Sequence, residues 1–436
     1  MTAGSGQTER VRRPRAAADG RADSRRRTQI LHAAAELFAS SGYARALLKD
    51  VADACGILPG SLYHHFDSKE SIAVELLERY RDALDAVAAA APRGADITAA
   101  DTAFEPISRF ATAIAGCALD HRAALQLSIY EPHAGAGAEL VRLARQRPVA
   151  IENALRELLD AVRSVGYLGA EIDRSILTEQ MCETMLHTGL SVLHRESAAD
   201  QVATVLCRLL FEGIAAKPPT DRDLDRSPAM RTARRIVDTW AEPAAYAEDD
   251  RLTMIRSVAR AEFARRGYEA TTMRDIAAAA ELGAGSVYRT VESKKALLDS
   301  IMGSFHAELS GAYQAVVGTD STSVAKLDAL TWINLSAIER FDEEFAIQRA
   351  WFRSSPPDTR GLLYALRQRA RQIRTVIEIG QRAGEIRLDG VAISRLSACV
   401  RDLIWMPPGL VAKVGTHTAL AHSRATLLRG AARAHH

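Results

Sequence analysis

The sequence is poor in cysteine and has no long, unbroken apolar stretch. Its five cysteines are widely spaced and include no C-x-x-C pair, which argues against a disulfide framework or a zinc site and favours reduced, buried thiols. Charged residues or His interrupt every apolar run before the ~20 residues that a membrane helix needs. The first residues are arginine-rich and lack an apolar segment, which excludes a secretory signal. We therefore expect a cytoplasmic protein that makes no membrane contact.

Aromatic residues are also scarce, at 6% of the chain, and the net charge is only +2. Alanine and leucine dominate the apolar share, and alternating β-branched runs are rare, so the composition predicts an all-α protein. A chain of 436 residues is too long for one core and indicates several domains. Metal-ligand spacing, a phosphate-binding glycine loop and a nucleophile elbow are all missing, so we expect neither an enzyme nor a cofactor.

Positive charge gathers at the start of the chain. Residues 1–27 hold eight arginines against three acidic residues, with Gly, Pro and Ala between them. This composition predicts a disordered basic arm over residues 1–24. Such an arm either follows DNA phosphates or enters a minor groove, or it is a solvated tail with no specific role.

An internal repeat organises the chain. The segments that start at Ile30 and Ile255 align without a gap at a constant offset of 225 residues. The shared residues include Phe38, Gly42, Tyr43, Asp50, Gly60, Ser61, Tyr63, Ser68 and Lys69, which match Phe263, Gly267, Tyr268, Asp275, Gly285, Ser286, Tyr288, Ser293 and Lys294. Glycine and aromatic identities at one fixed offset indicate two homologous units.

Each repeat predicts the same succession of helices. An amphipathic helix (25–40 and 251–265) comes first, then two short helices joined by a tight turn, and then a longer helix with Ser68 or Ser293 as its N-cap. Two short helices joined in this way form a helix-turn-helix, whose second helix can enter the major groove of DNA.

The side chains around this motif suit a nucleic acid. Small residues at the start of the second helix let the backbone approach DNA, the tyrosines can bond phosphate, and the basic groups can meet phosphates or base edges. Arg289 is the best base reader, because a guanidinium matches guanine bidentately. The candidate contacts from the residues themselves are Lys49, Leu58, Pro59, Gly60, Ser61, Tyr63, His64 and Lys69, and Thr271, Thr272, Arg274, Ala284, Gly285, Ser286, Tyr288, Arg289 and Lys294.

Both segments resemble the DNA-binding domain of the TetR family of repressors. The first copy meets the family pattern at Phe38, at Gly42-Tyr43, along 60–66 and at Ser68-Lys69-Glu70. The resemblance adds His65 as a phosphate contact. The second copy has Thr290 and Val291 where the family has His and Phe, so the resemblance implies a weaker contact and looser packing there.

The tandem arrangement resembles single-chain double TetR regulators. It implies two units, each a helix-turn-helix domain plus a helical domain for ligand binding and dimerisation, fused as an intramolecular pseudo-dimer. Helices near 171–214 would then pack against those near 389–430 in a four-helix bundle. The implied domains are an arm at 1–24, a first DNA-binding domain at 25–90, a first helical domain at 91–216, a linker with a short amphipathic helix at 217–249, a second DNA-binding domain at 250–312 and a second helical domain at 313–436.

The implied function is a transcriptional repressor released from double-stranded DNA by a hydrophobic small molecule. Because the two recognition helices differ, the operator should be non-palindromic. The candidate pocket residues are apolar or adaptable side chains on expected core helices: Leu127, Tyr130, Met181, Met185, Trp332, Phe345, Trp351, Phe352, Tyr364 and Trp405. Plain core packing is the alternative for all of them.

Two alternatives to this function stay open. In the first, the protein is a homodimer that binds DNA with the first head only, and the second head is degenerate. In the second, it is an interaction protein that senses ligand without binding DNA. The sequence also leaves open whether the pseudo-dimer forms a further homo-oligomer.

Overall fold

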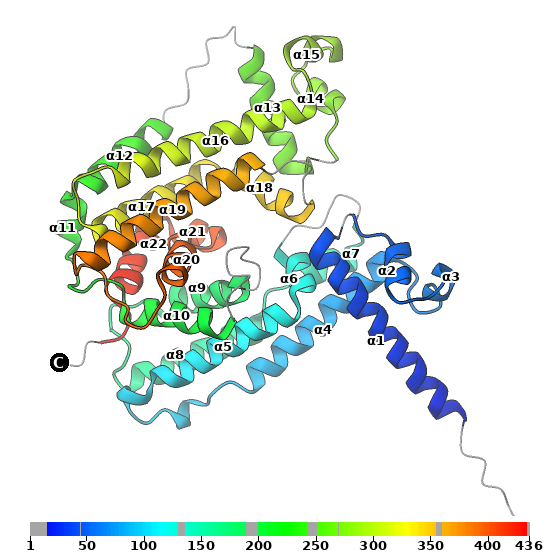
Figure 1. The fold of residues 1–436 in the computed structure, drawn as a ribbon, viewed down its shortest axis with the longest axis horizontal. Coiled ribbons are helices and arrows are strands. Elements are labelled where there is room, and N and C mark those ends of the chain that lie inside the picture. The colour runs from blue at the N-terminus through cyan, green and yellow to red at the C-terminus, as the bar shows by residue number, and fades with distance from the viewer. Residues whose placement is uncertain are drawn as a thin grey trace, which may run out of the picture.

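The computed structural model describes residues 15–43, 45–129, 136–188, 199–241, 251–268, 270–354 and 360–433. Within these ranges the chain forms helices and two isolated β-bridges but no strand, which confirms the all-α prediction (Figure 1). None of the helices in these ranges combines the length and apolarity that a bilayer crossing requires. All five cysteines are buried free thiols, as expected from their spacing.

The first unit runs from the blue helices to the first green ones in Figure 1. Its head consists of α1 (Arg15–Ser41), α2 (Leu48–Ala54), α3 (Pro59–Leu62) and the start of α4 (Lys69–Ala89). Its body continues with two 3₁₀ turns and with α5 (Phe104–Asp120), α6 (Arg122–Ile129), α7 (Ala138–Arg145), α8 (Val149–Ser164), α9 (Arg174–His187) and α10 (Ala199–Glu212).

The second unit repeats this order. Its head consists of α13 (Arg251–Arg266), α14 (Met273–Ala279), α15 (Ala284–Thr290) and the start of α16 (Lys294–Val317). Its body contains α17 (Ser323–Arg340), α18 (Asp342–Ser354), α19 (Arg360–Arg382), α20 (Ile393–Ile404), α21 (Pro408–Val414), α22 (Thr416–Ser423) and a closing π-helical turn, η5 (Arg424–Leu428).

The prediction of a disordered arm over residues 1–24 is wrong for residues 15–24. Helix α1 already begins at Arg15, and its first part extends away from the body of the molecule (Figure 1). The run Ala16–Ala18 explains the early start, because alanine has the highest helix propensity. Residues 1–14 lie outside the described ranges.

The amphipathic helix expected within the linker is present as α12 (Pro228–Ala241), after the short helix α11 (Asp221–Arg226). Helix α12 packs along α16 and α17 of the second unit. Its residues Ala229, Met230 and Ala233 are buried, and the Trp240 ring meets the Phe341 ring edge-on at 5.2 Å. The linker therefore ends as a structural part of the second unit.

A buried ion pair fastens the linker to the end of the chain. The Arg424 guanidinium on η5 donates two hydrogen bonds to the Asp328 carboxylate, at 2.9 and 2.8 Å, and a third to Asp225 on α11 at 3.0 Å. Both Arg424 and Asp328 are nearly inaccessible to solvent. Removing Arg424 would leave the Asp328 carboxylate buried without its cation, which is strongly destabilising.

The two units are joined by a reciprocal exchange of backbone. The segment after α10 pairs with the loop after α19, through the bridge Ala215–Ile386, and the segment after η5 pairs with the loop after α8, through the bridge Leu168–Ala432. Each unit thus gives its last residues to the equivalent loop of the other unit. This is the arrangement of an isologous dimer interface, built within one chain.

Two glycines mark the point where these segments cross. Gly213 and Gly430 both have a positive φ, +73° and +89°. A Cβ added to Gly213 would lie 2.5 Å from the carbonyl carbon of Arg429, and one added to Gly430 would lie 2.5 Å from that of Glu212. Only glycine allows this backbone approach.

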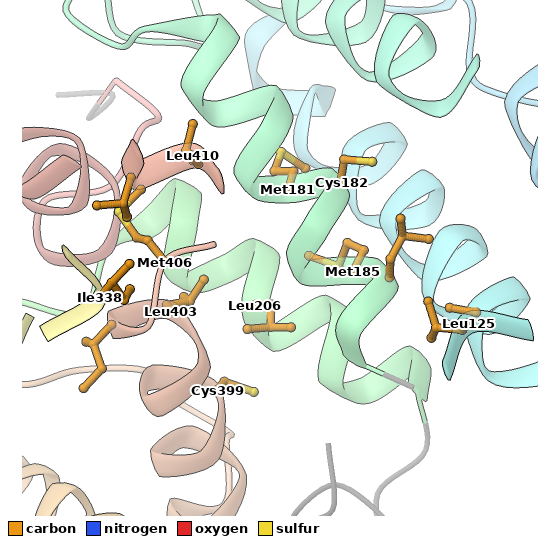
Figure 2. Close-up of a cluster of buried hydrophobic side chains, with 14 of the residues drawn as sticks. Leu125, Met181, Cys182, Met185, Leu206, Ile338, Cys399, Leu403, Met406 and Leu410 are labelled. Atoms are coloured by element: carbon orange, nitrogen blue, oxygen red, sulfur yellow. The ribbon is translucent and has the colours of Figure 1, made fainter. Parts of the chain in front are cut away.

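Side chains complete the interface between the units, as Figure 2 shows. Met181, Cys182 and Met185 of α9 lie in one buried cluster with Leu403 of α20 and with Met406, which precedes α21. The expected packing of helices near 171–214 against those near 389–430 is therefore present.

Candidate nucleic-acid interface

In the first head, packing separates a buried side from an exposed one. Gly56, with φ +64°, makes the turn after α2, and Pro59 begins α3 directly after the extended Leu58. The side chains of Leu62 and Phe66 hold α3 against the head and are almost fully buried. The opposite side of α3, which does not pack against the head, carries predicted contact residues.

That face is open to solvent. Leu58 is 76% exposed and Tyr63 is 55% exposed, although both are large and apolar or aromatic. The other predicted contacts of the first head are exposed as well, namely Pro59, Gly60, Ser61 and His64 in and after α3, and Lys49 on α2. The structure thus brings these seven predicted contact residues onto the exposed surface of one head.

The glycine at the start of each recognition helix is not needed by the fold. A Cβ added to Gly60 or to Gly285 would meet no atom within 4 Å, and neither residue has a positive φ. The free space lies outside the protein's own packing. A missing side chain at this place fits the close approach of another molecule to the backbone.

The second head presents a comparable surface with different chemistry. Arg274, Gly285 and Arg289 are exposed, and Tyr288 is 56% exposed. Ser286 is half-buried, and its hydroxyl accepts a hydrogen bond of 3.2 Å from Arg251. The Ala284 side chain lies outside the described part of the chain.

The two threonines predicted near α14 have separate roles. Thr272 is the N-cap: its hydroxyl accepts from the Asp275 amide at 3.1 Å, and the Asp275 carboxylate accepts from the Thr272 amide at 2.7 Å. Thr271 is fully buried, and its hydroxyl donates to the Gly267 carbonyl at 2.9 Å. The prediction of a DNA contact at Thr271 is wrong, because the side chain points into the head.

The prediction for Lys69 and Lys294 needs revision, since their ammonium groups face the protein. Lys69 Nζ donates to the carbonyls of Tyr43 and Ala46 at 2.8 and 3.1 Å and lies 4.5 Å from the centre of the Tyr43 ring. Lys294 repeats these contacts with the equivalent residues, Tyr268 and Thr271, at 2.8 and 2.9 Å. Each lysine closes the turn between the first two helices of its head, which is a structural role.

His65 likewise faces inward. Its Nδ1 lies 3.0 Å from the Asp23 carboxylate, and its side chain is only 15% exposed. Arg27 stacks its guanidinium 4.1 Å from the centre of the Phe66 ring and bonds Glu75 on α4. These contacts tie the end of the recognition segment to α1 and α4.

The second head lacks this clamp. Val291 stands at the position of Phe66 and is buried, and the Thr290 hydroxyl donates to the Ser286 carbonyl at 3.2 Å. Leu252 occupies the position of Arg27. The recognition segment is therefore tied to the first helix of its head by different contacts: by His65 with Asp23 and by Arg27 with Phe66 in the first head, and by Arg251 with Ser286 in the second.

The predicted pocket residues fall into separate groups. Met181 and Met185 are fully buried in the cluster between the units, and Leu127 packs against the core. In the second unit, the rings of Phe345 and Trp405 meet at 5.5 Å. Trp332 is also buried, and its ring contacts His417 on α22 at 5.1 Å.

The pocket prediction fails for Tyr364, which is 64% exposed because it lies on the outward face of α19. Tyr130 lies outside the described residues, as do the side chains of Trp351 and Phe352. Sequence reasoning also missed Arg369, a buried residue of α19. Its helix carries several other arginines, so no local pattern distinguishes it.

Comparisons with known proteins agree with the geometry of the heads. Residues 30–76 and 255–301 both match the family model described as bacterial regulatory proteins, tetR family. The matched segments contain the short helices α2 and α3 in one case and α14 and α15 in the other.

Individual relatives are similar over short stretches. HTH-type transcriptional repressor KstR2 of Rhodococcus jostii (strain RHA1) is 52% identical over 71 residues, which cover 16% of this chain and 35% of that protein. HTH-type transcriptional regulator UidR of Escherichia coli (strain K12) is 38% identical over 69 residues, or 14% and 35% of the two chains. The chain thus spans about a third of the length of these curated relatives.

A solved structure is similar over a longer stretch. The crystal structure of probable transcriptional regulatory protein RHA5900 matches with 28% identity and a TM-score of 0.37, over 42% of this chain and 100% of that one. Residues 30–76 and 255–301 are therefore each identified with the DNA-binding domain of the TetR family, and the chain carries this domain twice, in tandem.

Proposed function

We propose that this protein is a ligand-responsive transcriptional regulator in which one chain presents two unequal heads to one operator. The observation that carries the proposal is the pair of exposed recognition faces, one around Tyr63 and one around Tyr288, on units joined by a reciprocal interface. The matched repressors and regulators support the same class of function. The proposal assigns no catalytic step to the chain, and it places the protein in the cytoplasm.

The two faces predict different DNA sequences. Leu58 and His64 flank Tyr63 in the first head, whereas Arg289 flanks Tyr288 in the second. An arginine suits guanine, and an exposed leucine suits the methyl group of thymine. The operator should therefore have two dissimilar half-sites, about 34–36 Å apart between centres.

Lys69, Lys294 and His65 support the heads in this proposal instead of contacting phosphate. Their polar groups hold the turns and ends of the helix-turn-helix, so they fix the direction of the recognition helices. Tyr63, Ser61 and Lys49 in the first head, and the equivalent Tyr288, Ser286 and Arg274, are left as the phosphate contacts.

Release from DNA follows from the helices that connect head and body. Helices α4 and α16 each begin in a head and end in the helical body. A hydrophobic ligand that favours one packing of the body would change the angle of these helices and hence the distance between the heads. The affinity for DNA then falls by no more than the difference in ligand affinity between the two states.

Footprinting of the full chain on the DNA upstream of its own gene tests the proposal. We expect one protected region with two dissimilar half-sites on one side of the duplex. Tyr63→Ala should remove protection at one half-site and Tyr288→Ala at the other. An inverted repeat that depends on Tyr63 alone would instead indicate a homodimer reading with the first head, and no protection at all would contradict DNA binding.

A further inference from the structure

A buried arginine in the second unit has no anion to balance it. Arg369 on α19 is 5% exposed, and its guanidinium donates to Ser310 Oγ at 3.3 Å and lies 3.5 Å from His306 Nδ1. Both neighbours are on α16, and both are neutral. No ion pair to Arg369 is formed by any residue in the described ranges.

The same unit shows how this fold balances a buried arginine elsewhere. Arg424 is equally buried, at 6% exposure, and it is matched by the two oxygens of Asp328. An isolated charge in the protein interior costs several kcal/mol unless it is paired. Arg369 is therefore a buried cation to which the described residues supply no anion.

A second unpaired donor lies next to Arg369. Burial and the Arg369 charge lower the pKa of His306 to about 3, so the imidazole is neutral. Since Nδ1 faces the guanidinium as an acceptor, the ring proton is on Nε2. His306 Nε2 is buried and has no hydrogen-bond partner among the residues that the structure describes. Buried polar groups are nearly always satisfied, so an acceptor is missing here as well.

The other polar groups nearby are already used. Tyr313, on the same face of α16, bonds Asn334 on α17 at 2.8 Å, and Asn334 in turn donates to the Ile404 carbonyl at 3.2 Å. Neither supplies a negative charge to Arg369. Other buried polar atoms of this unit also have no hydrogen-bond partner among the described residues, such as Trp332 Nε1 and Gln372 Oε1, but they are neutral, whereas Arg369 is a cation.

Aromatic rings border this polar cluster. The Phe305 ring lies 4.8 Å from the His306 ring and 5.2 Å from Phe345, which in turn contacts Trp405. A molecule that satisfies the polar groups would have apolar surface beside it. This combination suits a compound with one carboxylate and a hydrophobic body.

We propose that Arg369, together with His306 and Ser310, binds the carboxylate of a hydrophobic effector within the second unit. The inference rests on the proposed function, because it names the chemical class of the effector. The carboxylate would join α19 to α16, the helix that carries the second head. Binding would therefore act on the angle of that head.

Calorimetric titration of the full chain with matched probes tests this proposal. The probes are 4-phenylbutyrate and decanoate, compared with the alcohols 4-phenylbutan-1-ol and decan-1-ol. We expect both carboxylates to bind at least about tenfold more tightly than the alcohols, since hydrogen bonds to a charged group are the stronger ones. Equal affinity for acid and alcohol, or no binding of either acid at millimolar concentration, would overturn the proposal.

Two variants separate a binding role from a structural one. Arg369→Met should lose at least about tenfold in carboxylate affinity and keep its alcohol affinity, and it should unfold at the same or a higher temperature because an unbalanced charge is removed. Arg371→Met, an exposed position on the same helix, should leave both affinities unchanged. If Arg369→Met melts at a lower temperature with its carboxylate affinity intact, Arg369 is structural and the proposal is wrong.

The titration does not depend on DNA. A chain that binds the carboxylates but leaves no footprint would refute the proposed function and keep this inference. A chain that gives the expected footprint but binds neither acid would refute this inference and keep the proposed function.

Discussion

Replacing Gly430 with alanine tests whether the crossing of the two chain segments holds the units together. The matched control is Gly166→Ala. Gly430 and Gly166 both have a positive φ, +89° and +81°, so alanine brings a similar backbone strain of roughly 1–2 kcal/mol at each position. An added Cβ at Gly166 meets nothing within 4 Å, whereas at Gly430 it lies 2.5 Å from the Glu212 carbonyl carbon.

Only the Gly430 variant must also move the backbone of the other unit. Forcing atoms into a packed region costs roughly 1–3 kcal/mol. The shift also strains the bonds from the Ala431 and Ala432 amides to the carbonyls of Leu210 and Phe211, both 2.9 Å long, at about 1 kcal/mol each. We therefore expect Gly430→Ala to lower the free energy of unfolding by about 3–5 kcal/mol more than Gly166→Ala.

Urea denaturation followed by far-UV circular dichroism gives this difference from the transition midpoints, provided that the slopes agree. The free energies of unfolding of the two variants could instead differ by less than about 0.5 kcal/mol, which is typical of surface substitutions. In that case the crossing does not contribute to the stability of the protein, and the joined pseudo-dimer is refuted.

Four further substitutions probe the heads and the buried ion pair. Lys69→Met should lower the stability of the first head by roughly 1–3 kcal/mol, because its hydrogen bonds to the turn are lost. Lys49→Met, at an exposed position, should leave the melting temperature unchanged and reduce the salt slope of DNA binding by about 1. The opposite pattern would show that Lys69 contacts phosphate. Thr272→Ala should raise the pKa of Asp275, which the hydrogen bonds from Thr272 and the contact with Arg266 hold at about 2. An NMR titration of Asp275 measures this change. In the wild type, the stabilising effect of the Asp275 carboxylate is present above about pH 4 and is lost as the pH falls toward 2. Arg424→Met should cost about 3–5 kcal/mol in urea denaturation because it leaves the Asp328 carboxylate buried without its cation, and a loss below about 1 kcal/mol would mean that solvent reaches the pair.

Local sequence was sufficient for the features that depend on neighbours along the chain. The helix-capping serines are examples: Ser68 accepts from the Ser71 amide and Ser293 from the Ala296 amide, both at 3.0 Å. Thr272 also caps α14, whereas its counterpart Leu47 forms no side-chain cap. These contacts span three residues, so residue type and spacing determine them.

Roles that depend on distant parts of the chain were not predictable in this way. Lys69 follows a typical motif, but its partners Tyr43 and Ala46 lie 26 and 23 residues earlier. The sequence could not show that the turn carbonyls face its ammonium. Arg369 is a similar case, because only packing of α19 against α16 reveals that it is buried without a carboxylate.

The crossing at Gly213 and Gly430 was beyond sequence reasoning for the same reason. Each glycine follows a helix, which is a common place for glycine. Nothing in the local sequence indicates that the two backbones touch. The repeat predicted that the units would pair, but the exchange of terminal segments is a property of the folded pair.

The mass of the protein–DNA complex tests the central claim most directly. Native mass spectrometry, or light scattering after gel filtration, would be applied to the full chain of 47.3 kDa on its footprinted operator. We predict one chain per operator, with both Tyr63 and Tyr288 needed for full affinity. Two chains per operator, with Tyr288→Ala binding as tightly as the wild type, would contradict it.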